Sequence, residues 1–102
     1  MVANAISGNI MQNGDLGTTT GTNTIVATPS PPLAALTTGA LYTCQFGGTN
    51  TGAATINVSG LGAVGLVKRA STALASGDAL VGATGLMRYN GTNMQLLNPV
   101  VP

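Results

Sequence analysis

Short apolar runs separated by Gly, Asn, Asp and Ser fill the second half of the chain, from Asn50 to Pro99. β-Branched and long apolar residues make up most of each run, and the separating residues are those that favour turns. A loop of Asn90-Gly91-Thr92-Asn93 joins the last two runs, and its Asn and Gly residues adopt positive φ at little cost. The pattern therefore predicts antiparallel β structure. The strands predicted in this half are Thr55–Val58, Val64–Lys68, Leu86–Tyr89 and Met94–Leu97.

The first half of the chain contains two further predicted strands, Thr22–Thr28 and Ala40–Phe46. Pro29-Ser30-Pro31-Pro32 ends the first of them, because proline has no N–H to donate to a β-ladder. Alternation along the second predicts that Tyr42, Cys44 and Phe46 share its buried face. The linking segments are expected to hold one helical turn at Leu33–Thr38 and a turn or a short helix at Ser71–Leu80.

The first 21 residues are polar, small and weakly patterned. Ile6 and Ile10 have the spacing of a helical face, but the intervening Gly8 and Asn9 weigh against a helix. We therefore expect residues 1–21 to form an extended N-terminal arm and residues 22–102 to form the β domain. The arm is expected to contact a neighbouring subunit through Ile6, Ile10 and Leu16, or else to fold back on its own domain.

Composition limits the core that this domain can build. Charged residues make up 5% of the 102 residues and aromatic residues 3%, while 15 positions are Gly; an average soluble protein has roughly 25% charged residues. A chain with so few large side chains is marginally stable as one isolated β-layer. We therefore expect an obligate homo-oligomer whose folding is coupled to assembly. The alternative is a monomer whose surface is polar through Thr, Ser and Asn.

Side chains that carry catalysis or bind metals are scarce. The chain has no His, and its two acidic residues, Asp15 and Asp78, each lie beside a Gly, where capping a turn is the ordinary role. Because general acid–base catalysis usually relies on His or paired carboxylates, the sequence indicates a protein that is not an enzyme. The single cysteine, Cys44, lies in an apolar run, which predicts a buried and inert thiol and leaves no set of metal ligands.

Cofactor, nucleic-acid and membrane binding are also disfavoured. Gly60, Gly62 and Gly65 have the spacing of a dinucleotide fingerprint, but the residues after them continue as a strand instead of opening a helix. A net charge of +1 provides no basic face for phosphate groups. No apolar run approaches the ~20 residues of a membrane span. We therefore expect no cofactor, no nucleic acid and no membrane among the partners.

Three parts of the second half resemble a small β module of tailed-bacteriophage virion proteins, particularly of tail fibres and related appendages. They are Asn50–Val58 (NTGAATINV) followed by Gly60-Leu61-Gly62, Leu74–Asp78 (LASGD), and Arg88–Pro99 (RYNGTNMQLLNP). The hairpin of that module often reads Tyr-Asp-Gly-Thr, and Asn90 replaces the Asp here. The resemblance implies a compact β domain, commonly trimeric, that serves as virion building material or displays a binding surface.

The resemblance leaves two places on the virion open. A tail fibre normally has an attachment domain, a shaft and a tip, which 102 residues do not accommodate, so we expect a capsid decoration (cement) protein that contacts the major capsid protein. The alternative is a tail fibre or tail appendage that binds a host surface receptor. Leu61 and Met94 are the interface residues expected on the module, with a place in the core as the other interpretation. The predicted fold is all-β, a small antiparallel β-sandwich or barrel-like module with an extended arm.

Overall fold

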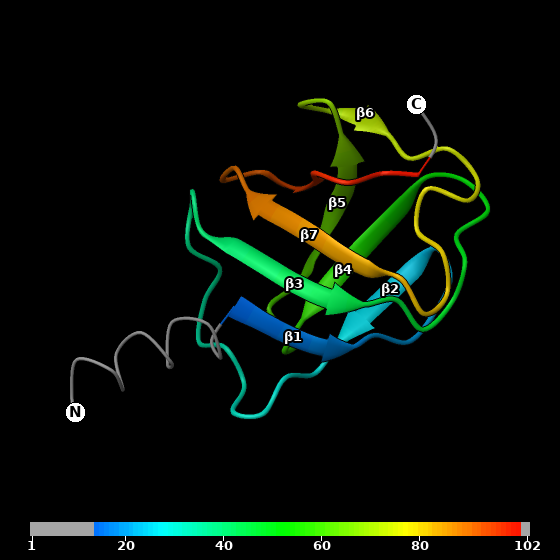
Figure 1. Ribbon diagram of the computed structural model, residues 1–102. Helices are drawn as coiled ribbons and strands as arrows, with labels where there is room; N and C mark the ends of the chain where they lie inside the picture. Colours follow the sequence, from blue (N-terminus) through cyan, green and yellow to red (C-terminus); the bar gives the residue numbers. More distant parts are fainter. Residues whose placement is uncertain (1–13, 101–102) are drawn as a thin grey trace.

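Eight strands form within residues 14–100, the part of the chain that the computed structural model describes (Figure 1). In chain order they are β1 (Asp15–Thr18), β2 (Thr24–Ala27), β3 (Leu41–Gln45), β4 (Ala54–Val58), β5 (Ala63–Lys68), β6 (Thr72–Ala73), β7 (Thr84–Tyr89) and β8 (Asn93–Leu96). Buried and exposed side chains alternate along β2, β4, β7 and β8, as expected for strands with one face toward a core. All six strands expected from the sequence are present, with ends shifted by a few residues.

The strands form one mixed sheet that curls into a nearly closed barrel. Their order is β1-β3-β7-β8-β5-β4-β2, with β6 paired to the far end of β5. Thr20 and Val26 then exchange two backbone hydrogen bonds of 3.0 Å, which join the end of β1 to β2. The all-β, barrel-like class expected from the sequence is thus confirmed.

The pairing differs from the expected antiparallel arrangement at three places. β1 pairs with β3, β2 with β4 and β5 with β8 in parallel, while the remaining ladders are antiparallel. Parallel partners need a long connection between them. In each of these three pairs, at least one other strand lies between the two partners along the chain. The hydrophobic pattern specifies which face of a strand is buried, but it does not specify which distant strand lies beside it.

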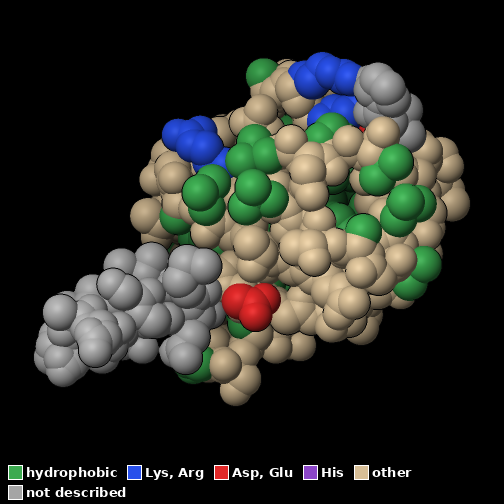
Figure 2. Space-filling view, in the orientation of Figure 1, with side chains coloured by type: hydrophobic (Ala, Val, Ile, Leu, Met, Phe, Trp, Pro, Cys, Tyr) green, Lys and Arg blue, Asp and Glu red, His purple; other side chains and the backbone are tan. Residues whose placement is uncertain are grey.

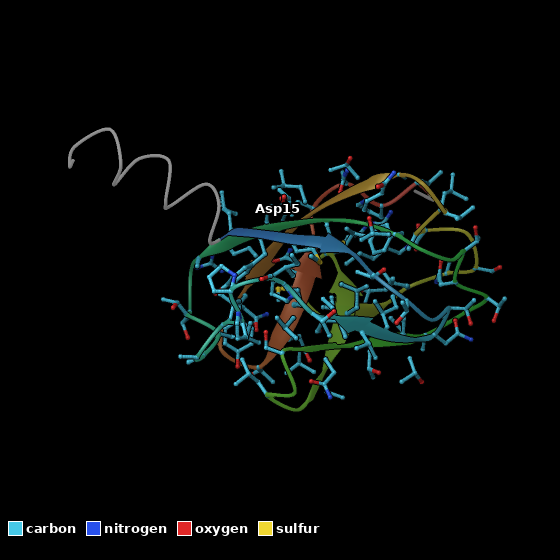
Figure 3. All side chains as sticks on the ribbon, turned by 90° about the horizontal axis from the view of Figure 1, so that it is seen from below. Asp15 is labelled. Carbon is cyan, nitrogen blue, oxygen red and sulfur yellow. The ribbon has the colours of Figure 1, made fainter. Side chains whose placement is uncertain are left out.

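Large apolar side chains from every long strand fill the interior. Figure 3 shows β1, β3 and β7 on one side of the molecule, β2 and β4 on the other, and side chains between them. Tyr42, Cys44 and Phe46 are all buried, which confirms the predicted inner face of β3. The largest fully buried apolar side chains are Leu16, Ile25, Ile56, Leu66, Met87, Met94, Leu96 and Val58.

A glycine on β7 lets an aromatic ring enter this core. Gly85 lies opposite Cys44 in the β3–β7 ladder, and a Cβ at position 85 would be 2.6 Å from the Phe46 ring. The ring of Phe46 therefore occupies the space that a side chain on β7 would need. A larger residue at this position would force the ring or the strand to move.

The first described strand corrects the expected arm. β1 pairs with β3, and its Leu16 side chain is only 1% exposed, so residues 15–18 belong to the β domain. Thr19 continues the attachment: its amide donates to the Gln45 carbonyl at 2.9 Å, and its hydroxyl accepts from the Gly47 amide at 3.1 Å. The arm expected over residues 1–21 is therefore wrong in its last part, and residues 1–13 lie outside the described residues.

Of the two linking segments, residues 33–38 differ from expectation, whereas residues 71–80 contain the turn that was one of the two possibilities expected there. No helix forms at residues 33–38; this segment is held instead by the Leu33 amide donating to the Ser59 hydroxyl and the Thr37 amide donating to the Tyr42 hydroxyl. Residues 71–80 contain the short strand β6 and a turn before Asp78. Each segment also has a hydrogen bond to a distant part of the chain, from the Leu33 amide to Ser59 and from the Gly77 amide to the Asn50 carbonyl.

Candidate functional site

Three charged side chains of the β domain, Lys68, Asp78 and Asp15, make ionic or hydrogen-bonded contacts within the fold. Lys68 and Asp78 form a buried ion pair, with 2.8 Å between Nζ and Oδ2. Asp78 Oδ2 also accepts a 2.7 Å hydrogen bond from the Ala75 amide, so the predicted turn-capping role of this residue is confirmed. Asp15 is exposed and accepts a hydrogen bond from the Gly17 amide. Within residues 14–100, no three His, Cys, Asp or Glu residues lie together as metal ligands would.

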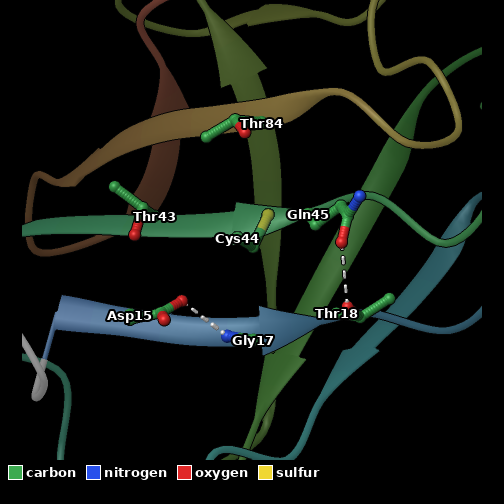
Figure 4. Close-up of a pocket in the computed structure, with 7 residues that line it drawn as sticks. All are labelled: Asp15, Gly17, Thr18, Thr43, Cys44, Gln45 and Thr84. Carbon is green, nitrogen blue, oxygen red and sulfur yellow. Dashed lines mark hydrogen bonds between the residues drawn. The ribbon is translucent and has the colours of Figure 1, made fainter.

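A polar hollow lies on the outer surface where β1, β3 and β7 run side by side (Figure 4). Its volume is about 700 Å³, and Thr43, Gln45 and Thr84 contribute polar side chains to its lining. The Gln45 side chain accepts a hydrogen bond from the Thr18 hydroxyl and donates one to the Gly82 carbonyl. These bonds fix the orientation of the amide, so the hollow is a preformed polar surface.

Cys44 is part of the floor of this polar hollow, while its side chain lies on the buried inner face of β3. Desolvation by burial raises the pKa of its thiol to about 11; the nearby Asp15 carboxylate acts in the same direction and a backbone hydrogen bond with Gly85 opposes it. Because the thiolate is the nucleophilic form, a thiol with this pKa is a poor nucleophile at neutral pH. Its burial agrees with the prediction made from its apolar neighbours.

An apolar groove adjoins the polar hollow, and Thr43 lines both. The groove has a volume of about 710 Å³ and lies between the starts of β1 and β3 and the segment that connects β2 to β3. Its main lining residues are Gly14, Pro32, Leu33, Leu41, Tyr42 and Leu86. None of the residues that line this groove is charged, so it suits an apolar partner.

Two leucines that line the groove are exposed, and Leu97 extends the apolar surface beyond it. Leu41, Leu86 and Leu97, which we call the outer leucines, are 55%, 37% and 42% exposed. Leu86 lies diagonally across the β3–β7 ladder from Leu41, and the Leu97 amide donates to the Leu86 carbonyl. Figure 2 shows hydrophobic side chains grouped on this face of the molecule, with basic side chains at its margin. The groove and the outer leucines together form the candidate interaction surface.

The residues expected at an interface differ in where the structure places them. Leu16 and Met94 are buried in the core, at 1% and 0% exposure. Leu16 therefore does not lie at a surface interface, and Met94 has the core position that was its second interpretation from the sequence. Met94 faces inward because it occupies an alternate position of β8, between the partly exposed Asn93 and Gln95. Leu61 is exposed in the turn between β4 and β5 and is not one of the residues that line the groove. Ile6 and Ile10 lie outside the described residues.

Sequence reasoning did not single out Leu41 and Leu86 as residues of an interaction surface, although a signal was present. Each alternates along its strand with an inward-facing neighbour, Tyr42 or Met87, so the period of two places both leucines on the outer face. An apolar residue at a position that the alternation assigns to solvent is a marker of an interaction surface.

Comparisons with known proteins add no family to this description. No protein-family model matches the chain, and a search of curated proteins finds no similar sequence. Within residues 14–100, no helix has the length and hydrophobicity that crossing a bilayer requires.

Proposed function

We propose that this chain is a non-enzymatic structural protein of a bacteriophage virion, and specifically a capsid decoration protein that stabilises the head through contacts between subunits. The resemblance to phage virion modules supports the proposal, and the three resembling parts lie in and around β4, β5, β7 and β8. The observation that carries a structural role is the candidate interaction surface, where large apolar side chains are exposed on a protein with very little charge.

The apolar surface favours attachment by buried area. Contact with the major capsid protein would remove the outer leucines from water, at ~25 cal/mol for each Å² of apolar surface. The chemistry available at the surface also favours packing over catalysis, because the groove lining is uncharged and the thiol of Cys44 is buried and protonated.

The seam of the barrel offers a second mode of attachment. Among the described residues, β1 and β2 are joined to each other only through the Thr20–Val26 bridge. The remaining edges of these two short strands are therefore suited to pairing with an added strand from a neighbouring subunit. Strand addition would supply main-chain hydrogen bonds, while the adjoining groove would take apolar side chains.

The experiment is to mix the purified chain with undecorated capsids and, separately, with tail-bearing particles, and to locate it by electron microscopy. A regular lattice of added density on the capsid surface is the expected result. Density only at the tail or neck would overturn the decoration role and favour the tail appendage, with host adsorption as the next assay. Leu86→Asp is expected to weaken capsid binding, whereas Val81→Asp, at a 63% exposed position outside the groove, is the matched control.

The arm is tested on the same particles. Ile10→Asp is expected to leave the β domain folded, because residues 14–100 form the whole described sheet, and to weaken attachment. If this variant decorates capsids as well as the unmodified chain, then the arm takes no part in attachment.

A further inference from the structure

We propose that the apolar groove receives the N-terminal segment, residues 1–13, of a second copy of this chain. The inference deepens the proposed structural function and rests on it, because it names how copies of the protein hold one another. It assigns the occupant of a surface that the described residues leave exposed.

The groove leaves large apolar side chains exposed to water. Leu41, Leu86 and Leu33 present apolar side chains to a space of about 710 Å³, and Leu41 is 55% exposed. Proteins bind ligands in hollows of roughly 300–1,000 Å³, so the groove has room for several side chains. Apolar side chains left in water around such a hollow favour a partner that covers them.

The described chain begins at the edge of the groove. Gly14 lines the groove and directly precedes β1, so residues 1–13 join the β domain at the rim of this hollow. β1 is parallel to β3, and both strands start at the same side of the barrel (Figure 1). A segment that joins the domain at this rim is placed to reach the groove of a neighbouring copy packed against it.

The N-terminal segment and the groove lining are both uncharged. Residues 1–13 contain no charged side chain, and neither does the groove lining, so no charge would lose water on docking. Val2, Ile6 and Ile10 recur at intervals of four residues. In an extended chain, such positions share one face, as a row of side chains entering a groove requires.

The N-terminal segment is long enough to reach a neighbouring copy, and the resulting contact can repeat around a ring. Thirteen extended residues span at most ~43–47 Å, which is enough to cross from one small domain to the next. A segment that leaves one copy and enters another makes a head-to-tail contact, and such contacts close into rings when the rotation between copies allows it. A closed ring of this kind is compatible with the trimer that the resemblance implies.

The test uses full-length variants and measures self-association by analytical ultracentrifugation. Ile10→Asp changes the segment, Leu41→Asp changes the groove, and Val81→Asp is the exposed control outside the groove. The first two are expected to weaken association by about tenfold or more, and the control by less than about twofold. Leu86→Asn repeats the groove change on a second strand, in case Leu41→Asp perturbs the fold.

Mixing the two defective variants decides between exchange and self-docking. The Ile10→Asp chain keeps an intact groove and the Leu41→Asp chain keeps an intact segment, so together they are expected to form a heterodimer that neither forms alone. A labelled peptide of residues 1–13 is likewise expected to bind the Ile10→Asp chain and not its Leu41→Asp counterpart.

Three outcomes would overturn the inference: an unmodified chain that stays monomeric, association unaffected by either variant, or a mixture that fails to associate. Capsid decoration is measured separately with the same proteins. Loss of exchange with decoration intact would refute the inference alone, whereas exchange without decoration would refute the proposed function alone.

Discussion

At the scale of single residues, the least expected feature is a buried ion pair in a chain with only three basic and two acidic side chains. The Lys68 and Asp78 side chains are 4% and 0% exposed. Asn50, also fully buried, donates to the Gly52 and Ala75 carbonyls and accepts from the Ala79 amide. The ion pair joins the loop before β7 to β5, and the Asn50 side chain joins the same loop to the segment before β4. Buried polar groups that are fully bonded in this way specify one loop conformation.

Lys68→Met is therefore expected to destabilise the protein strongly. The substitution leaves the Asp78 carboxylate buried without its cation, and breaking a buried pair in this way costs about 3 kcal/mol or more. Lys68→Met/Asp78→Asn should recover part of that loss, because the amide is neutral and its oxygen still accepts from the Ala75 amide. Urea unfolding measures both variants. A single variant as stable as the unmodified chain would show that the ion pair does not hold the loop.

The Cys44 thiol gives a pH dependence of known sign. Burial raises the pKa of this thiol from 9.0 to about 11, so the folded state favours the protonated form. Its contribution is complete below about pH 9 and is lost as the pH rises toward about 11, which amounts to about 2–3 kcal/mol. Urea unfolding from about pH 8 to about pH 11 should therefore show a steeper loss in the unmodified chain than in Cys44→Ala. Parallel curves would contradict the shift.

At the scale of elements, β1 decides where the folded domain begins. It has four residues, and only Leu16 among them faces the core. Leu16→Ala is expected to lower the free energy of unfolding by about 3 kcal/mol, the usual cost of removing a buried leucine side chain. Thr18→Ala, which removes an exposed hydroxyl from the same strand, should change it by less than about 0.5 kcal/mol. Equal, small effects would mean that β1 is not part of the cooperative unit.

The same elements explain how much of the fold the sequence predicts. The strands β3 and β4 alternate buried and less buried residues over five positions, which is enough to identify a strand and its inner face. β1 was missed because Asp15, Gly17 and Thr18 surround its one apolar residue. β6 has two residues and no pattern at all. The parallel pairings depend on contacts between distant segments, which local alternation does not encode.

The candidate site was predicted less well than the fold, because it depends on which apolar residues remain outside. Met94 and Leu61 are both long apolar residues near turns, yet one is buried and the other exposed. Met94 lies at an inward position of β8, whereas Leu61 lies in the turn between β4 and β5. Leu41 was assigned to the outer face by the same alternation that buried Tyr42, but the groove beside it forms only when β1 and the segment before β3 are brought together.

At the scale of the whole molecule, the distribution of charge sets the kind of contact the protein can make. Lys68 and Asp78 neutralise each other inside the barrel. The exposed charged side chains within residues 14–100 are Asp15, Arg69 and Arg88. Three separated charges do not create a field that steers a partner, so a partner of the proposed kind would gain its binding free energy mainly from the apolar groove and the outer leucines.

Attachment that depends on apolar burial should be nearly insensitive to salt. Raising NaCl from about 50 mM to about 500 mM shortens the screening length to a few ångströms and weakens exposed ion pairs, while apolar contacts persist. We therefore expect capsid binding and self-association to change by less than about threefold over this range. Arg88→Gln, which removes a charge beside the outer leucines, should behave like the unmodified chain. A fall in affinity of about tenfold or more would instead mean that charged groups of the partner carry the contact, since log affinity then declines with log salt.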